Sequence, residues 1–429
     1  MLSFIEKENH FHHREEVNFI PDSPWDLARL SQMPNIYPLF EDEASGIKAI
    51  FYDGVSYKGN KTRVFAYYGV PEAKGERPEN PPLVPGILLV HGGAGSAFAQ
   101  WVKLWNDRGY AAIAMDLEGQ IPFSSYEELS GESRIDTNTV PTEFSSHPWS
   151  GPAKQGVFAD YAEPPQDQWF YHAVAAVLSA HTILRSLPGV DPDRIGVTGI
   201  SWGGIITSLM AGLDKRLRFA MPIYGCGYLY EPGTFYGAGF AAMPPDYAEK
   251  IRRLWDPSSY LQHSRIPMLW VNSNQDTHFP LSIFMKSYAH YEQNNADAHL
   301  HSRISIQHGL PHSYSAAWSC PESYAFADSI TGAGPPLIRI TQSEQCGESL
   351  QISFDSQIEV TEAVLYWCEE AADWRRTSWN RVQAVVVQEE TNVEQGTATV
   401  ALPYGNCAFY MELANNNGWR TSTALMKKN

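Results

Sequence analysis

One stretch of the chain, residues 194–210, limits the possible folds more than any other. The apolar run Ile195–Thr198, directly after Arg194, leads into the turn Gly199-Ile200-Ser201-Trp202-Gly203, and an apolar helical pattern follows directly. A strand that turns this sharply into a helix needs glycines on both sides of the serine, because a Cβ there would clash with neighbouring backbone. The stretch therefore predicts a buried strand, a strained Ser201 with an exposed hydroxyl, and a helix whose N-terminus faces that hydroxyl.

Short apolar runs that alternate with helical stretches extend this pattern from residue 86 to residue 306. Because the runs are apolar throughout, they predict strands buried on both faces, as in a parallel sheet covered by helices. Helices are expected over residues 98–108 and 168–186. The prediction for residues 81–333 is a doubly wound, mostly parallel α/β sheet. The apolar runs are Ile87–Val90, Ala111–Met115, Ile195–Thr198, Phe219–Ile223, Met268–Val271 and Ile304–Ile306.

The regions before and after this α/β pattern have a different sequence pattern, which is typical of antiparallel strands. Residues 1–80 contain two β-rich runs, 49–57 and 62–70, which predict an extension with a β-hairpin that packs on the α/β domain. After a Gly/Pro-rich boundary, residues 337–429 form several short runs of alternating polarity, which predict a small β-sandwich of the immunoglobulin or fibronectin type. These C-terminal runs are Leu350–Phe354, Glu362–Trp367, Val382–Val387 and Ala408–Leu413.

The composition limits the partners of the chain. The 429 residues carry a formal net charge of −17, so the acidic surface is expected to repel nucleic acid and anionic membranes. No segment is apolar for long enough to span a bilayer, and the polar N-terminus has no signal-peptide core, so a cytoplasmic location is expected. The five cysteines are odd in number and form no Cys-x-x-Cys pair, which argues against a disulfide framework and against a cysteine-based zinc site.

A second glycine-rich turn follows the first apolar run and reads His91-Gly92-Gly93-Ala94-Gly95. It lacks the Lys-Ser/Thr pair of a phosphate-binding P-loop. Glycines at this position leave backbone N–H groups free to stabilise a negatively charged oxygen. We expect the N–H groups of Gly93 and Trp202 to form an oxyanion hole, with Gly92 or Ala94 as alternatives to Gly93.

Asp276 is the candidate acid. A serine hydroxyl becomes a nucleophile at neutral pH only if a base accepts its proton, and that base needs an orienting carboxylate. In strand–turn–helix nucleophile sites of this kind, the acid and then the histidine follow the serine along the chain. Asp276 lies in a polar turn after the run 268–271, where the acid is expected. Asp256 precedes Pro257 and is the weaker candidate, because it has the position of a helix cap.

His312 is the candidate base. The last predicted strand is followed by Gln307-His308-Gly309-Leu310-Pro311-His312, so two histidines are available. His308 lies at the strand end, where side chains are usually packed, whereas His312 lies on a loop that can reach Ser201. This favours His312 and leaves His308 as the alternative. His278 and His301 are expected to be ordinary surface or supporting histidines.

Taken together, these segments resemble the acetyl xylan esterase and dienelactone-hydrolase-like branch of the α/β-hydrolase superfamily, close to bacterial carbohydrate esterases. The resemblance implies an α/β-hydrolase fold for residues 60–330 and a Ser201, Asp276 and His312 triad. There are two departures: Ala94 replaces a frequent glycine, and Ser201 stands where dienelactone hydrolases have cysteine. The matching segments are Thr62–Pro71, Val90–Val102, Arg108–Asp116, Asp167–Val174, Asp193–Gly204 and Pro311–Tyr314.

The function that this resemblance implies is a serine carboxylic-ester hydrolase that removes small acyl groups, acetyl on carbohydrate among them. Such a reaction needs no metal and no cofactor. A prolyl-oligopeptidase-like peptidase is the first alternative, although only about eighty residues precede the catalytic domain. A catalytically silent binding protein is the second alternative, and the complete set of candidate residues argues against it.

Three candidate roles remain for the C-terminal domain: glycan binding, contact with the catalytic domain, or formation of a homo-oligomer. Trp374, Trp379 and Trp419 are candidates for a sugar-binding platform. Core packing is the expected use of at least two of these tryptophans.

Overall fold

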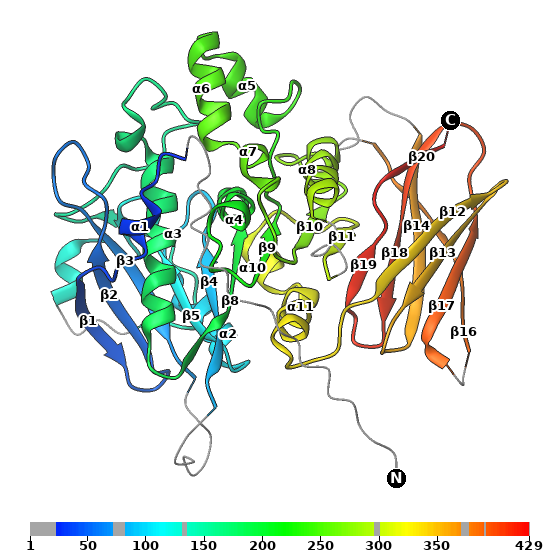
Figure 1. Ribbon diagram of the computed structural model, residues 1–429, viewed down its shortest axis with the longest axis horizontal. Coiled ribbons are helices and arrows are strands. Elements are labelled where there is room, and N and C mark those ends of the chain that lie inside the picture. Colours follow the sequence, from blue (N-terminus) through cyan, green and yellow to red (C-terminus); the bar gives the residue numbers. More distant parts are fainter. Residues whose placement is uncertain are drawn as a thin grey trace.

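A nine-stranded sheet forms the centre of the larger part of the molecule (Figure 1). In this computed structural model, residues 23–71, 82–130, 135–295, 301–369, 377–389 and 392–428 are described. The strand order is β1-β2-β3-β5-β4-β8-β9-β10-β11. The strands are β1 (Ile36–Asp42), β2 (Ile47–Asp53), β3 (Arg63–Gly69), β4 (Val84–Val90), β5 (Ala111–Met115), β8 (Val190–Ile200), β9 (Phe219–Ile223), β10 (Leu269–Ser273) and β11 (Arg303–Gln307).

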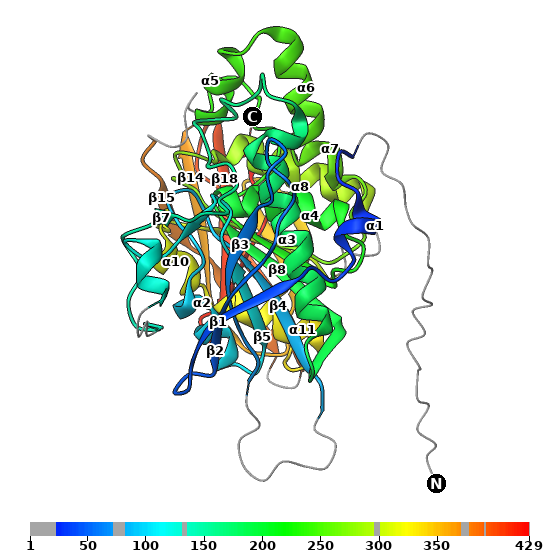
Figure 2. The same ribbon diagram turned by 90° about the vertical axis from the view of Figure 1, so that its left-hand side faces the viewer.

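The six strands from β5 to β11 in this order run parallel, as their apolar sequences predict. Every residue of β5 and of β9 is buried, because helices cover both faces of the sheet (Figure 2). The predicted doubly wound α/β fold is thereby confirmed. The helices of this part are α1 (Leu27–Leu30), α2 (Ala99–Asn106), α3 (Trp169–Ser186), α4 (Trp202–Leu213), α5 (Phe235–Ala241), α6 (Pro245–Trp255), α7 (Ser258–Leu261), α8 (Leu281–Asn294), α10 (Tyr314–Trp318) and α11 (Pro321–Thr331), with the 3-10 turns η1 (Tyr126–Ser130) and η2 (Pro165–Asp167).

The N-terminal strands continue the central sheet. The expected hairpin forms between β2 and β3, with Lys48 opposite Tyr68 and Asp53 opposite Arg63. Strand β1 pairs antiparallel with β2, and β3 pairs antiparallel with β5. Residues 36–69 therefore supply one edge of the same sheet and do not form a separate layer on it. A short ribbon of β6 (Gln120–Ile121) and β7 (Ser145–Ser146) lies outside the sheet.

The C-terminal residues form two antiparallel sheets around a core of their own. One sheet has the order β12-β13-β17-β16; the other has the order β15-β14-β18-β19, with β20 also paired to β18. The strands are β12 (Arg339–Cys346), β13 (Ser349–Asp355), β14 (Val360–Glu369), β15 (Asn380–Gln383), β16 (Val385–Glu389), β17 (Asn392–Ala401), β18 (Cys407–Asn415), β19 (Arg420–Ser422) and β20 (Met426–Lys428).

The prediction of one continuous strand over residues 382–387 is wrong. The chain crosses from one sheet to the other at Ala384, so two strands form. Strand β15 belongs to the five-stranded sheet and β16 to the four-stranded sheet. Ala384 is buried, and its N–H donates to the carbonyl of Ala363. A small apolar residue at the crossing continues the apolar run into Val385, Val386 and Val387, so the sequence pattern does not reveal the break.

The five-stranded sheet packs beside β11 at the far edge of the central sheet (Figure 1). The N–H of Ile306 donates to Ser422 Oγ at 2.9 Å. Tyr366 and Tyr410 belong to the same continuous apolar cluster as the α/β core. The C-terminal domain therefore lies against the strand that leads to His308 and His312.

Within the described ranges, no helix has both the length and the apolar character needed to cross a bilayer.

Candidate active site

Ser201 lies in the turn between β8 and α4, in a strained backbone conformation. Its φ and ψ are 58° and −115°, a region that L-residues with a side chain rarely adopt. The surroundings hold it there, because its N–H donates to the carbonyl of Ile223 at 3.0 Å and its carbonyl accepts from the N–H of Ile205 at 2.9 Å. The serine therefore begins the helix with its side chain turned away from the helix axis.

The two glycines of the turn are required by backbone contacts. A Cβ on Gly199 would overlap the carbonyl of Gly203, and a Cβ on Gly203 would overlap the carbonyl of Val90. Since backbone cannot move aside as a flexible side chain can, any larger residue would push α4 away from β4 and β8.

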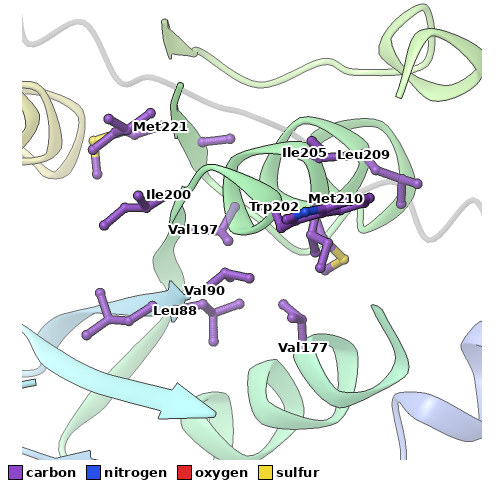
Figure 3. Close-up of a cluster of buried hydrophobic side chains, with 14 of the residues drawn as sticks. Leu88, Val90, Val177, Val197, Ile200, Trp202, Ile205, Leu209, Met210 and Met221 are labelled. Carbon is purple, nitrogen blue, oxygen red and sulfur yellow. The ribbon is translucent and has the colours of Figure 1, made fainter. Parts of the chain in front are cut away.

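A dense apolar cluster lies behind the turn and fixes it to the sheet (Figure 3). Side chains from β4, β8, β9, α3 and α4 meet in this cluster, and Trp202 lies at its edge. Burial of several such side chains contributes about 1.5–3 kcal/mol each, which offsets the backbone strain at Ser201. The labelled residues are Leu88, Val90, Val177, Val197, Ile200, Trp202, Ile205, Leu209, Met210 and Met221.

The loop after β4 passes directly beside the Ser201 turn. A Cβ on Gly92 would lie 2.7 Å from the Ile200 carbonyl oxygen and 3.1 Å from Ser201 Cβ, so only glycine fits there. Gly93 lies beside the Trp202 indole, and its carbonyl accepts from the Tyr314 hydroxyl at 3.1 Å. Ala94 has a φ of 56°, in the left-handed region that favours glycine.

His91 holds this loop as a neutral ring. Its Nε2 accepts from the N–H of Leu117 at 2.9 Å, and its Nδ1 lies 2.7 Å from the carbonyl of Gly92. Burial lowers the pKa of His91 to about 4, because a charged imidazole is unfavourable in this apolar place. The ring therefore orients the loop and carries no charge at neutral pH.

Asp276 follows β10 and is buried, with both carboxylate oxygens engaged. Its Oδ1 accepts from the backbone N–H groups of His278 and Phe279 at 2.8 and 2.7 Å. Its Oδ2 lies 2.6 Å from Nδ1 of His312. The backbone bonds stabilise the ionised carboxylate, and the remaining oxygen orients the imidazole.

His312 lies on the loop between β11 and α10, within a group of aromatic rings. Its ring centroid is 4.7 Å from that of Tyr224 and 4.6 Å from that of His278. The Phe279 ring is stacked on it at 6.2 Å with an interplanar angle of 9°. About a quarter of the His312 side chain is exposed, so the imidazole remains accessible from the mouth of the site.

The structure brings the Ser201 turn and the Asp276–His312 pair to the same place. Tyr224, which packs on His312, directly follows Ile223, whose carbonyl binds Ser201 N–H. The position of a Gly92 Cβ, 3.1 Å from Ser201 Cβ, is also 3.3 Å from the Tyr314 hydroxyl, two residues after His312. All five predicted site residues therefore lie at the carboxyl edge of the parallel strands.

The two alternative residues have other partners. Asp256 accepts from the backbone N–H groups of Tyr228, Leu229 and Ser258, so its carboxylate caps local turns. The Nδ1 of His308 is 3.0 Å from Asn274 Nδ2, and its ring is stacked on Tyr366 of the C-terminal domain at 4.9 Å. In this arrangement His308 faces the domain interface.

Tyr236 on α5 is a site residue that the sequence did not indicate. It is buried, and its hydroxyl is within hydrogen-bonding reach of the Ser201 side chain. Its ring packs edge-on against Trp202 at 5.1 Å. The segment between β9 and β10 has no motif for this role, so only the fold of α5 over the sheet edge reveals it.

The long polar loop before α3 and the α5–α6 segment together enclose the site. Phe158 from the loop is buried, and its ring lies 5.3 Å from Trp202 and 5.8 Å from Phe240 on α5. Lys154 Nζ lies 5.7 Å from the centre of the Trp202 ring. The surroundings of the nucleophile are therefore largely aromatic, with one cation above Trp202.

The two described tryptophan candidates of the C-terminal domain, Trp379 and Trp419, are partly buried. Trp379 packs edge-on against Tyr410 at 5.5 Å, and both Trp379 and Trp419 pack against the main apolar cluster. Trp374 lies outside the described residues. Both described tryptophans thus pack at the edge of the core, and a role in sugar binding stays a prediction.

Two family descriptions match this chain. Residues 22–230 match acetyl xylan esterase (AXE1), and residues 159–333 match the prolyl oligopeptidase family. The first range contains the Ser201 turn and the Gly92–Gly93 loop, and the second contains Ser201, Asp276 and His312. Together they extend over the whole α/β part of the chain.

The individual proteins that the chain matches have low sequence identity to it. An uncharacterized peptidase, YuxL, of Bacillus subtilis (strain 168) is 26% identical over 108 residues, which are 22% of this chain and 15% of that protein. An acetyl xylan esterase from Thermoanaerobacterium sp. JW/SL YS485 has a TM-score of 0.46 at 19% identity, over 72% of this chain and 94% of that chain. A Pyrococcus horikoshii acylaminoacyl peptidase has a TM-score of 0.41 at 17% identity. The match covers 61% of this chain and 37% of that chain.

This chain therefore spans less than half the length of the peptidases that it matches. The strand order and the Ser201 turn give the chain the fold of an α/β-hydrolase. Residues 22–230 are similar to acetyl xylan esterase, and residues 159–333 are similar to the prolyl oligopeptidase family.

Proposed function

We propose that the protein is a serine hydrolase that removes small acyl groups from carboxylic esters, with acetyl on carbohydrate as the substrate class. The contact between Asp276 and His312 beside the strained Ser201 turn is the observation that carries this proposal. A nucleophile, a base and an orienting acid are the minimum set for acyl transfer through a covalent intermediate.

In the first half of the reaction, Ser201 Oγ attacks the ester carbonyl carbon and His312 accepts its proton. Asp276 holds the imidazole through Nδ1 and stabilises its positive charge. The N–H groups of Gly93 and Trp202 stabilise the oxyanion that forms. His312 then gives the proton to the departing alcohol as the C–O bond breaks, which leaves an acyl-enzyme on Ser201.

In the second half, water attacks the acyl-enzyme while His312 accepts one of its protons. The second tetrahedral intermediate collapses, and the proton returns to Ser201 Oγ as the carboxylic acid leaves.

The preference for small acyl groups rests on the aromatic enclosure. Phe158 and Tyr236 pack edge-on against Trp202, and Phe240, on the same helix α5 as Tyr236, packs on Phe158. Close-packed rings leave little room for a long acyl chain, and overpacking such a space costs about 1–3 kcal/mol. The match to acetyl xylan esterase over residues 22–230 supports acetyl as the group removed.

The test compares p-nitrophenyl acetate with the butyrate and octanoate esters, and with acetylated xylo-oligosaccharides, for the wild-type chain and Ser201→Ala. We expect kcat/KM to fall as the acyl chain lengthens, and Ser201→Ala to remove turnover of all the esters. Equal rates for acetate and octanoate would contradict the small-acyl preference. Unchanged turnover in Ser201→Ala would contradict the mechanism.

A peptidase is the second candidate, because the prolyl oligopeptidase match covers all three proposed triad residues and a curated relative is named a peptidase. The same mechanism cleaves amides when the leaving amine is protonated. A dipeptide p-nitroanilide measured beside the acetate ester separates the two. Faster hydrolysis of the anilide would favour the peptidase. No hydrolysis of either substrate would favour a binding protein.

A further inference from the structure

A second imidazole lies against the proposed base. His278 follows Asp276 by two residues, and its N–H donates to Asp276 Oδ1 at 2.8 Å. This local turn brings the His278 ring to 4.6 Å from the His312 ring, with an interplanar angle of 38°. The Phe235 ring packs on His278 at 5.2 Å. The position of His278 is therefore fixed from both sides, although the mechanism gives it no task.

Asp276, His278 and His312 bring three side chains of metal-ligating types together. One ligand atom from each of these three side chains lies within 4.8 Å of the others. In the part of the chain that the structure describes, no second group of His, Cys, Asp or Glu residues is gathered in this way. Ligand atoms that lie about 2.0–2.2 Å from a tetrahedral zinc ion are separated by about 3.3–3.5 Å, so small ring rotations are enough to bind one ion.

The chemistry of the three donors favours Zn²⁺ over hard cations. Imidazole nitrogens suit zinc and similar transition metals, whereas magnesium and calcium prefer oxygen ligands. Asp276 is buried and supplies the negative charge.

We propose that Asp276, His278 and His312 bind Zn²⁺ reversibly, and that the bound ion switches off the hydrolase. The inhibition rests on the proposed function, whereas the metal site rests on the three donors alone. If zinc takes the Nδ1 lone pair of His312, the ring proton moves to Nε2, which can then no longer accept the Ser201 proton, and the contact with Asp276 is broken. If zinc takes Nε2, the atom that accepts the Ser201 proton is blocked. Either geometry removes the base.

The experiment measures zinc binding and zinc inhibition separately, on the full chain. Zinc chloride is titrated calorimetrically into Ser201→Ala and into Ser201→Ala combined with His278→Phe, which keeps a ring against Phe235 but supplies no ligand. Hydrolysis of p-nitrophenyl acetate is then followed against zinc concentration in variants with Ser201 intact. His263→Gln, in the loop between α7 and β10, is the matched histidine control, and magnesium chloride is the cation control.

We expect His278→Phe to weaken zinc binding by at least about tenfold relative to Ser201→Ala. We expect the same substitution to raise the half-inhibitory zinc concentration by at least about tenfold relative to the wild type. His263→Gln and magnesium should change neither quantity. His278→Gln repeats the test if the Phe variant does not fold. Equal zinc affinity with and without His278 would overturn the site, and zinc binding without inhibition would overturn the switch. If the wild type hydrolyses no ester but its zinc affinity still depends on His278, the metal site stands and the proposed function fails.

Discussion

The Ser201 turn (residues 199–203) and the acid–base loops (residues 274–279 and 308–314) meet at one place but are held in different ways. The turn is held by backbone contacts inside the apolar core, where neither glycine can acquire a Cβ. The loops are held by side-chain contacts, among them the Asp276–His312 bond and the stack of His308 on Tyr366. The conformation of the nucleophile turn is therefore specified by its own glycines and held by buried backbone, whereas the position of the base depends on side chains from separate loops.

The largest effect is expected within the acid–base loops. His312→Ala should lower kcat/KM for p-nitrophenyl acetate by about 10⁴- to 10⁶-fold, because Ser201 loses its proton acceptor. The matched control is His308→Ala, four residues away, which should retain activity within about tenfold. Circular dichroism of both variants verifies the fold. The opposite ranking of the two variants would move the base to His308.

A large loss of stability is expected in the Ser201 turn. Gly203→Ala would place a Cβ on the backbone of Val90 and should cost about 3–5 kcal/mol in free energy of unfolding, or prevent folding. Urea denaturation provides the measurement. Gly151→Ala is the control, because the nearest atom to its Cβ would be 3.6 Å away, and its cost should stay within about 1 kcal/mol. An equal loss of free energy of unfolding in the two variants would contradict the close backbone packing around Gly203.

A smaller, pH-dependent effect is expected where the C-terminal domain meets the α/β domain. Burial raises the pKa of Glu412 on β18 to about 7, and Arg420, with Nε 3.6 Å from Oε1, offsets only part of that shift. The neutral carboxyl is thus favoured in the folded state, so its stabilisation is present below the unfolded pKa near 4.5 and is lost as pH rises through 7.

Glu412→Gln keeps the neutral shape at every pH. Its Tm relative to wild type should therefore rise between pH 5 and pH 8, by the equivalent of about 1–3 kcal/mol. Glu344→Gln, at an exposed position on β12, should show no such trend. A Tm difference for Glu412→Gln that stays constant with pH would contradict the burial of a titrating carboxyl at this interface.

The smallest effect is expected in the oxyanion loop. Ala94 has a left-handed φ of 56°, which costs an L-residue about 1–2 kcal/mol. Ala94→Gly removes that strain but adds about 0.4–1 kcal/mol of unfolded-state entropy. The net gain in free energy of unfolding should be about 0.5 kcal/mol, measured by thermal denaturation. A clear loss of stability would show that the Ala94 methyl group packs favourably enough to outweigh the strain.

The difference between the Ser201 turn and the acid–base loops also explains which features the sequence could predict. The Ser201 turn and the buried strands are local patterns, and the predicted positions of β5 and β9 agree with the structure residue by residue. Asp276 and His312 could be proposed because they follow predicted strands in the expected order. Their contact is the structural support for a role that stays a prediction.

Other features depend on how distant segments fold together, and no local pattern encodes them. Tyr236 reaches Ser201 only because α5 folds over the sheet edge. His278 was expected to be an ordinary histidine, since nothing in its neighbours indicates that its ring meets that of His312. The division of residues 382–387 between two sheets was hidden because Ala384 joins the apolar run Val385–Val387 without a polar or turn residue at the crossing.

The role of Ser201 as the nucleophile is the central claim, and covalent labelling tests it most directly. A fluorophosphonate reacts when a serine oxygen attacks phosphorus and fluoride leaves, and the adduct is located by peptide mass spectrometry. We predict one adduct on Ser201 in the wild-type chain, none in Ser201→Ala, and slow labelling in His312→Ala but not in His308→Ala. An unlabelled wild type, or an adduct on another residue that persists in Ser201→Ala, would contradict the account.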